Sequence, residues 1–480
     1  MDELTGWLTM TLIAAERLAA MGAVVHAIYR KRRNPTSAAS WAIACVFVPI
    51  LGTFFYVVIG AERIQRRVLR RRRRSEQRVH ELIARTQPLP AEAADEQALA
   101  VRAGLGPLGG NAFVSGNGLT IHVDGDAAYP AMLTAIRSAQ RCIAVASYIF
   151  DSRRTEGDGK EDAVSRELLA ALVERARAGV HVRVLYDAVG SLHTPARFFA
   201  PLRDAGGRVQ EFFPRLHAWR LNFRDHRKLL LVDNRTGFVS TLNISERHMR
   251  SGPCFGSHDW SLEIAGPVTE QLRLAFEREW LFATDEDVEA EDVETAPPAG
   301  ACAVQVLEGG PFQHDPVFLT SLVSAIHHAR HEVLLVTPYF LPDATLRAAI
   351  RTAAQCGVAV SIMVPQNCRH GLVNLARMTD LRVLAAEYGV RVLFLAGPLL
   401  HMKLAIIDQE VVYLGSSNLD NRSLFLNFEL DVVVASRQFA RCALNTLAPD
   451  MDAAVTLEDT RPPFMTRWCE RAAALFAPLL

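Results

Sequence analysis

The sequence has few features that would cross-link the chain or bind a metal. Its 480 residues include eight cysteines, but no two of them form a C-x-x-C pair. This scatter argues against a disulfide framework and against a zinc site, so we expect reduced thiols and a cytoplasmic body. The N-terminus also lacks the basic start and the A-x-A site of a cleaved signal peptide. We therefore expect the apolar N-terminal part to remain on the chain.

The chain has no net charge either, but its charges are unevenly distributed. Half of the residues are hydrophobic, which is enough for two or more cores. The N-terminal part is apolar and basic, whereas residues 284–294 contain seven acidic side chains and are expected to be a solvated linker. The region after residue 110 shows no basic stripe with interleaved aromatic residues, which disfavours a nucleic-acid-binding protein.

Two apolar stretches precede this region. Residues 38–60 are a nearly uncharged stretch of 23 residues. A helix of that length can cross the hydrocarbon core of a bilayer, so we predict a transmembrane helix there, which Pro49 and Gly52 would bend. Residues 4–29 are also apolar but carry Glu16 and Arg17, which are costly at the centre of a membrane helix. This first stretch is expected either to span the membrane or to lie partly in the interface.

Basic residues follow both apolar stretches. Residues 30–33 supply four and residues 63–78 supply nine, so the positive-inside rule places the longer basic segment in the cytoplasm. A simple hairpin of two spans would then put residues 30–33 outside, a conflict that a shallow or re-entrant first helix would remove. The longer segment is expected to flank the membrane, and it could also gather anionic lipid headgroups.

One stretch, HMKLAIID, places an imidazole and an ammonium on one face of a strand. Because alternate residues of a strand face the same side, His401 and Lys403 project together in front of a buried apolar run that ends at Asp408. The returning strand leads to a Gly-Ser pair ending at Ser416, where small side chains let a ligand approach the backbone, and then to Asn418. This arrangement suits an anionic group such as a phosphate.

The same pattern occurs earlier in the chain, and chance does not explain two copies. The members of the first copy are His226, Lys228, Asp233, Ser240, Thr241 and Asn243. Before both copies, an amphipathic helix feeds a strand that ends at Tyr148 or Tyr339, and a helix capped by glycine leads into a further strand. The chain therefore contains two α/β repeats that share one order of elements.

With these motifs the chain resembles the phospholipase D superfamily, which has paired HKD motifs, and within it the bacterial cardiolipin synthase group. The resemblance covers nearly the whole chain. Its more specific parts are residues 34–41 (NPTSAASW), 49–52 (PILG), 224–228 (RDHRK), 337–340 (TPYF) and 418–429 (NLDNRSLFLNFE). The first motif departs from the usual Gly-Gly or Gly-Ser by having Ser240 and Thr241.

The resemblance implies an α/β fold of two pseudo-symmetric phospholipase D-like sandwich repeats preceded by N-terminal transmembrane helices. We expect six segments: a membrane anchor at 1–62, a basic segment and linker at 63–110, the first repeat at 111–283, an acidic linker at 284–300, the second repeat at 301–455, and an amphipathic segment at 456–480. The last segment would cap the fold or, as the second choice, contact the membrane.

Breaking a phosphodiester requires an attacking group, a proton donor for the departing alkoxide, and positive charge around the phosphoryl oxygens. Two H-x-K strands that meet at a pseudo-two-fold axis supply all three. The resemblance implies that His226 attacks phosphorus to form a phosphohistidine, and that His401 protonates the leaving alcohol and later deprotonates the incoming one. Lys228 and Lys403 would hold the charge of the phosphate.

Other motif residues are expected to support this chemistry. Asn243 and Asn418 would donate amide hydrogens to the phosphate oxygens, with Ser416 beside them in the substrate-binding part. By resemblance, Asp259 and Glu429 stand where carboxylates orient the two histidine rings.

Two carboxylates complete the catalytic motifs, Asp233 and Asp408. They stand at strand ends, five residues past each lysine, so bracing the fold is favoured over contact with substrate. An ammonium two residues from each histidine repels a cation, so we expect no metal and no other cofactor at this site.

Two functions remain open at this point. The first is cardiolipin synthesis, in which a phosphatidyl group passes from one phosphatidylglycerol to another with release of glycerol. The second is hydrolysis of phospholipid or nucleic acid by a phospholipase D-type phosphodiesterase, and the anchor disfavours nucleic acid. Both H-x-K pairs are intact, which disfavours an inactive scaffold. The expected partners are membrane phospholipids, namely phosphatidylglycerol and cardiolipin, with a homo-oligomer left open. The expected location is the cell inner (cytoplasmic) membrane, with the catalytic region in the cytoplasm.

Overall fold

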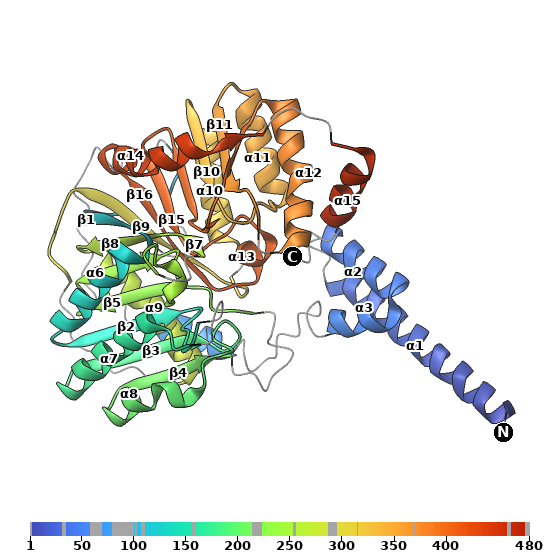
Figure 1. Ribbon diagram of the computed structural model, residues 1–480, viewed down its shortest axis with the longest axis horizontal. Helices are drawn as coiled ribbons and strands as arrows, with labels where there is room; N and C mark the ends of the chain where they lie inside the picture. The colour runs from blue at the N-terminus through green and yellow to red at the C-terminus, as the bar shows by residue number, and fades with distance from the viewer. Residues whose placement is uncertain are drawn as a thin grey trace.

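The computed structural model describes residues 2–30, 35–57, 70–78, 100, 103–106, 111–154, 160–213, 223–252, 256–286, 295–313, 315–368, 370–457 and 462–475. Most of the linker predicted within 63–110 and the middle of the acidic linker at 284–300 lie outside these ranges. Figure 1 shows a body of two α/β lobes, from which the N-terminal helices project to one side. The fold class expected from the duplicated motifs is confirmed.

The first lobe is a mixed sheet with helices on its faces. Its strands are β1 (Val114–Val123), β2 (Cys142–Ser147), β3 (His181–Asp187), β4 (Arg208–Phe212), β5 (Lys228–Val232), β6 (Thr236–Ser240) and β8 (Trp260–Ala265). Its helices are α6 (Asp124–Ser138), α7 (Ala163–Arg177), α8 (Ala200–Asp204) and α9 (Thr269–Thr284). The strands lie in the order β1-β8-β6-β5-β2-β3-β4, with β2, β3 and β4 parallel to one another.

The second lobe repeats this plan. Its strands are β9 (Cys302–Gly309), β10 (Glu332–Val336), β11 (Ala359–Pro365), β12 (Arg391–Leu395), β14 (Leu404–Ile407), β15 (Val411–Gly415), β16 (Glu429–Ala435) and β17 (Val455–Thr456). Its helices are α10 (Val317–His328), α11 (Ala344–Gln355), α12 (Gly371–Tyr388), α13 (Asn421–Phe425) and α14 (Arg437–Ala453). The order β9-β16-β15-β14-β10-β11-β12 matches that of the first lobe strand by strand.

The two lobes join along one edge. Strands β1 and β9 pair antiparallel, so that the described strands of both repeats form one continuous fifteen-stranded sheet. A second, parallel pairing links β13 (Leu399–Leu400) of the second repeat to β7 (Ser257–His258) of the first. These pairings hold the segment before His401 against the segment before Asp259.

The motif strands are buried on both faces, which explains why they read as continuous apolar runs. In β5, Leu229 and Leu231 belong to an inner core shared by both repeats. Leu230 and Val232 instead pack with helices α6 and α7 on the outer face. Strand β14 alternates in the same way between the shared core and the outer core of its own repeat. The strand period of two therefore fixes the side on which each histidine and lysine lies.

Three helices form the N-terminal part: α1 (Asp2–Arg30), α2 (Pro35–Phe47) and α3 (Pro49–Phe55). Trp41 and Cys45 of α2 pack with Tyr56 and with alanines of α1. The Tyr56 hydroxyl lies 2.7 Å from His26 Nδ1, which links the end of α3 to α1. Figure 1 shows α2 and α3 beside the C-terminal half of α1, while its N-terminal half extends away from the body.

The assignment of membrane spans needs a correction. Among the described residues, the stretch that is long and apolar enough to cross a membrane is Gly6–Tyr29 in α1. The span predicted at 38–60 is not one helix, since the chain breaks at Val48 (φ −130°, ψ 68°). The break is caused by Pro49, whose ring excludes the residue before it from the helical region. Helix α3 packs so closely against α2 that a side chain at Gly52 would collide with the Ala44 carbonyl.

One arginine of the basic segment packs into the body of the protein. Residues 70–78 are helical, and Arg72 is buried in the body, where its Nη1 lies 2.5 Å from Glu279 Oε1. The Arg72 guanidinium also lies over the Phe428 ring, 5.8 Å from its centroid. Ser75 Oγ donates to the Arg278 carbonyl at 2.7 Å. At least one arginine of the run is therefore part of the core rather than free for lipid headgroups.

The C-terminal helix α15 (Phe464–Ala474) has two different faces. On one face, Ala473 packs with Val373 of α12, and Glu470 pairs with Arg382 at 3.3 Å. On the other face the exposed apolar side chains are Phe464, Met465 and Trp468. Ser40 Oγ of α2 donates to the Leu475 carbonyl at 3.1 Å, which brings this end of the chain against the N-terminal helices. The capping role is thus seen, and the membrane contact stays a prediction.

Candidate active site

The two motif histidines lie on one cavity of about 340 Å³. The lining includes His226 and His401, Asn243 and Asn418, and Tyr148 and Tyr339, one of each pair from each repeat. The backbone of each histidine is fixed by the opposite repeat: His226 N–H donates to the Phe428 carbonyl and His401 N–H to the His258 carbonyl, both at 2.8 Å. The cavity is therefore a property of both repeats together.

Each histidine is held by a carboxylate that belongs to the other repeat. His226 Nδ1 lies 2.9 Å from Glu429 Oε2, and His401 Nδ1 lies 2.8 Å from Asp259 Oδ1. Glu429 begins β16 of the second repeat, and Asp259 immediately precedes β8 of the first. A carboxylate at Nδ1 fixes the proton on that nitrogen and leaves the Nε2 lone pair available. Both rings are therefore set for chemistry at Nε2.

Burial and the lysines keep both imidazoles neutral in the free site. Burial, together with Lys228 and Lys403, lowers the pKa of His226 well below its usual value. Burial and Lys403 lower the pKa of His401 to about 3, although Asp259 opposes them. The pKa of Lys228 is lowered to about 8 and that of Lys403 to about 7, since burial outweighs their carboxylate neighbours. A bound anion would offset the lysine charges and so favour protonation of a histidine.

The two carboxylates are in unequal environments. Burial raises the pKa of Glu429 to about 7. Burial would raise the pKa of Asp259, but electrostatic attraction and hydrogen bonds from His401 and His248 outweigh it and hold that pKa well below its usual value. Asp259 also receives a hydrogen bond from Thr241 Oγ1 at 2.7 Å. Asp259 is thus the firmly ionised member of the pair.

Strand β8, which pairs with β6, leaves room for the serine at position 240 of the first motif. Ser240 stands where the second motif has Gly415, and its Oγ lies 2.6 Å from Ser261 Oγ. A side chain at Gly415 would collide with Asp431, which stands at the position of Ser261 in the second repeat. Glycine is therefore required only where the cross-strand partner is large.

Five residues predicted to be catalytic or to bind substrate are not on the cavity wall: Lys228, Lys403, Ser416, Asp233 and Asp408. Ser416 lies behind His226: its carbonyl is 3.2 Å from His226 Nδ1, and its Oγ accepts from Leu430 N–H. Its substrate-binding role is therefore corrected to support of His226. Asp233 directly follows β5 and Asp408 directly follows β14, so each aspartate lies at the opposite end of its strand from the motif lysine.

Each of these two aspartates caps a neighbouring strand. Asp233 accepts hydrogen bonds from the backbone N–H groups of residues 140–142, at 2.7 to 2.9 Å. Asp408 accepts from residues 330–332 at 2.8 to 2.9 Å. Three charge-assisted bonds to strand starts stabilise the fold, which is the bracing role that the sequence favoured over a catalytic one.

Several cavity residues had not been singled out from the sequence. They are Arg224, Arg247, His248, His370 and Arg422. Arg247 and Arg422 could have been found, because each stands four residues after the asparagine of its motif. His248 could not, since the second repeat has Ser423 at the matching position.

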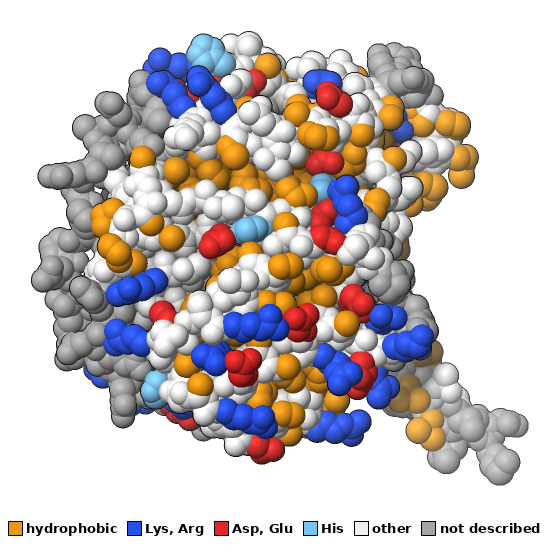
Figure 2. Space-filling model, turned by 60° about the vertical axis from the view of Figure 1, so that its left-hand side comes forward, with side chains coloured by type: hydrophobic (Ala, Val, Ile, Leu, Met, Phe, Trp, Pro, Cys, Tyr) orange, Lys and Arg blue, Asp and Glu red, His pale blue; other side chains and the backbone are white. Residues whose placement is uncertain are grey.

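The face drawn in Figure 2 carries Lys and Arg side chains interspersed with Asp and Glu over the lower lobe, and hydrophobic side chains in a band across the middle. Such mixing differs from the continuous basic stripe of a nucleic-acid groove.

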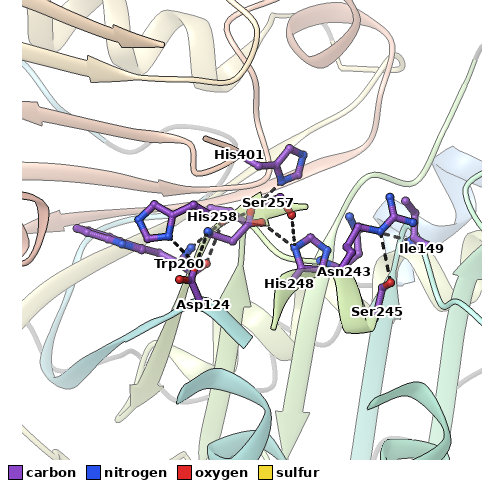
Figure 3. Close-up of polar contacts among 12 residues, drawn as sticks. Asp124, Ile149, Asn243, Ser245, His248, Ser257, His258, Trp260 and His401 are labelled. Carbon is purple, nitrogen blue, oxygen red and sulfur yellow. Dashed lines mark hydrogen bonds and ion pairs between the residues drawn. The ribbon is translucent and has the colours of Figure 1, made fainter. Parts of the chain in front are cut away.

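A charged histidine braces the two repeats next to the site. His258 Nδ1 lies 2.6 Å from Asp124 Oδ1, and its Nε2 lies 2.9 Å from Asp450 Oδ2 in the second repeat. Burial opposes the charge, but these two hydrogen bonds raise the pKa of His258 to about 9. Figure 3 shows His258 and Asp124 close to Trp260, at the start of β8.

We expect this histidine to make stability depend on pH. Because the folded-state pKa is raised from 6.5 to about 9, the contribution is fully present below pH 6.5 and is lost as pH rises through about 9. The free energy of unfolding should fall by up to ~3 kcal/mol over that window. Denaturant unfolding in detergent at a series of pH values measures this, and His258→Gln should flatten the slope. An unchanged slope in His258→Gln would contradict the assignment.

Comparison with known proteins places the chain. The family model described as "Cardiolipin synthase, PLD-like domain" matches residues 132–280 and 322–448, which together exceed half of the 480 residues. The chain belongs to the phospholipase D-like cardiolipin synthase family. The model "Phospholipase_D-nuclease N-terminal" matches residues 18–60, a range that includes α2 and α3.

Members of the cardiolipin synthase family match over nearly the full length. "Cardiolipin synthase A" of Pseudomonas entomophila (strain L48) is 31% identical over 98% of both chains. The protein of the same name from Pseudomonas fluorescens (strain SBW25) is 32% identical over 95% of both. The crystal structure of phosphatidylserine synthase from Haemophilus influenzae Rd KW20 has a TM-score of 0.59 at 14% identity, covering 80% of this chain and 100% of that one. This last likeness concerns the fold alone.

Proposed function

We propose that this chain is a cardiolipin synthase, which transfers a phosphatidyl group from one phosphatidylglycerol to another and releases glycerol through a phosphohistidine intermediate. The observation that carries the proposal is the exchange of carboxylates: Glu429 holds His226 and Asp259 holds His401 at Nδ1, so that two neutral imidazoles share one cavity. The family membership and the names of the relatives support the choice of lipid.

In the first step, His226 Nε2 attacks the phosphorus of the donor lipid. A P–N bond forms, and the P–O bond to the glycerol headgroup breaks. His401, as imidazolium, gives its proton to the departing oxygen, so glycerol leaves as the neutral alcohol. The negative charge of the bound phosphodiester offsets Lys403, and ionised Asp259 supports the imidazolium. Asn243 and Asn418 on the cavity wall would face the phosphoryl oxygens. Lys228 and Lys403, whose ammonium groups donate to the carbonyls of His226 and His401, would supply positive charge from behind that wall.

In the second step, the reaction runs in reverse with a different alcohol. Neutral His401 takes the proton from a glycerol hydroxyl of the second phosphatidylglycerol, whose oxygen attacks phosphorus. The P–N bond breaks, and cardiolipin forms. The phosphohistidine retains the free energy of the bond just broken, so the transfer needs no nucleotide. A bilayer supplies the second hydroxyl at high local concentration.

The alternative is hydrolysis, in which water replaces the second lipid and phosphatidic acid is the product. Both reactions use the same two histidines, so the site residues alone do not separate them. The match over 98% of "Cardiolipin synthase A" is what favours transfer.

Purified full-length protein in phosphatidylglycerol vesicles, with EDTA and without nucleotide, should form cardiolipin and free glycerol in equal amounts. Lipid mass spectrometry with an enzymatic glycerol assay measures both products. Phosphatidic acid as the main product would assign the chain to the hydrolases. A strict requirement for phosphatidylethanolamine or for a CDP-activated donor would mean that the substrate is wrong.

We infer that the catalytic region lies on the cytoplasmic side of the inner membrane. Helix α1 is long enough to span, whereas α2 and α3, with 13 and 7 residues, would each fall short of a ~30 Å core. If α2 and α3 enter the membrane and return to the side they came from, the basic residues 30–33 and 63–78 lie on the same side. This topology removes the conflict with the positive-inside rule. Failure of a membrane-impermeant maleimide to label an engineered C-terminal cysteine in intact spheroplasts is the expected result.

A further inference from the structure

A second histidine shares the carboxylate that holds His401. His248 is buried at the end of the short helix η4 (Glu246–His248). Its Nδ1 lies 2.7 Å from Asp259 Oδ2, while His401 Nδ1 lies 2.8 Å from Oδ1 of the same side chain. The two imidazole rings are 6.2 Å apart between centroids. Figure 3 shows His248 on the first-repeat side and His401 on the ribbon of the second repeat.

The hydrogen bonds of His248 fix the position of its proton. The backbone N–H of Asn243, which can only donate, meets His248 Nε2 at 3.2 Å. Nε2 must therefore carry the lone pair, and the ring proton is on Nδ1, facing Asp259, with Ser257 Oγ 2.8 Å away. A second ring proton, on Nε2, would point at the backbone N–H of Asn243. His248 is thus held as a neutral donor.

Asp259 consequently receives three donors inside the protein. They are His401 Nδ1, His248 Nδ1 and Thr241 Oγ1, at 2.7 to 2.8 Å. A buried carboxylate with several donors remains ionised. The titratable groups around His401 are Lys403 of its own motif, Asp259 and His248. Of these, ionised Asp259 is the group that favours the imidazolium.

The other half of the site has a serine in place of this second histidine. Ser423 stands where the first repeat has His248, five residues after the motif asparagine. Glu429 lies 2.9 Å from His226 Nδ1 and accepts a hydrogen bond from Asn427 Nδ2 at 3.2 Å, and the side chains of Ser416 and Ser423 are further hydrogen-bond partners that partly offset the effect of burial on its pKa. The two histidines are therefore related by pseudo-symmetry but differ in the group behind their carboxylate.

We infer that His248 is a positioning residue that fixes Asp259 for His401 and thereby assigns proton transfer to the His401 half of the site. This inference rests on the proposed two-step reaction. His248 also joins the backbone of Asn243 to Asp259, so it links a phosphate-facing residue to the proton donor.

The test compares two leaving groups in full-length protein. The native headgroup needs a proton to depart, whereas the nitrophenolate of phosphatidyl-p-nitrophenol leaves as an anion. His248→Phe keeps an aromatic ring but removes the hydrogen bonds to Asp259, Asn243 and Ser257. In a single turnover, which isolates the first step, we expect release of glycerol from phosphatidylglycerol to slow about 10- to 100-fold, with release of nitrophenol within about threefold of wild type. His248→Asn, whose amide can still donate to Asp259, should recover most of the rate.

A purely structural role for His248 would slow both substrates equally, and that outcome, or no loss with either, overturns the inference. If His248→Phe proves unstable by thermal unfolding, His248→Ala with added imidazole replaces it. Imidazole should then restore glycerol release selectively, and equal or absent rescue on both substrates again overturns it. A hydrolase would also release nitrophenol, so the role of His248 is tested even in a protein that makes no cardiolipin. Failure to make cardiolipin would refute the proposed function alone.

Discussion

Replacing either His226 or His401 with asparagine is expected to lower the rate of cardiolipin formation by at least ~1,000-fold, because residues that act as one unit are each indispensable. Both rings line one cavity, and each is held by the opposite repeat. The measurement is initial rate in phosphatidylglycerol vesicles at equal amounts of folded protein. His327→Asn, at an exposed position on α10, is the matched control and should retain the wild-type rate.

The exchanged carboxylates sharpen this prediction. Asp259→Asn should resemble His401→Asn in its kinetic defect, and Glu429→Gln should resemble His226→Asn, although each pair spans two repeats. Losses of about 10- to 100-fold are expected for the carboxylates, since they act through the rings. If a single histidine variant kept about half of the wild-type rate, the repeats would hold two independent sites and the shared-cavity model would fail.

The second large effect concerns the covalent intermediate. When phosphatidylglycerol labelled with ³²P is mixed with the protein and quenched within one turnover, label that is stable to base and labile to acid should remain on the chain. His226→Asn should abolish it completely. The structure favours His226 as the attacking group because Asp259, behind His401, is the firmly ionised carboxylate and best supports a proton donor.

The reverse pattern of labelling would change the assignment. Label that survives in His226→Asn but is absent from His401→Asn would make His401 the nucleophile. Absence of label in wild type, under conditions where cardiolipin forms, would indicate direct displacement by the second lipid. Digestion and mass spectrometry of the labelled peptide provide an independent check of the modified residue.

Much of the body followed from the sequence because a duplication is visible at the level of residues. The two H-x-K motifs and their strand period predicted that His401 and Lys403 project together, and the resemblance pointed to Asp259 and Glu429. The sequence did not reveal that the two carboxylates serve the opposite repeats. That exchange depends on how β7 meets β13 and how Phe428 meets the His226 backbone, contacts between segments far apart in the chain.

Two other features were missed for local reasons. Hydropathy over 38–60 counts apolar residues but does not detect that Pro49 breaks the helix at Val48. His248 has no counterpart in the second repeat, and a search for repeated residues passes over it.

The exchange of carboxylates also bears on how such a duplicated chain can change over time. A substitution at Asp259 is felt by the histidine of the second repeat, and one at Glu429 by the histidine of the first. Neither repeat can therefore lose its site residues alone, because the histidine of one repeat depends on the carboxylate of the other. Positions whose contacts stay within one copy are freer to diverge, such as Ser240 with Ser261 and Gly415 with Asp431. Loss of either repeat would therefore inactivate the site of both.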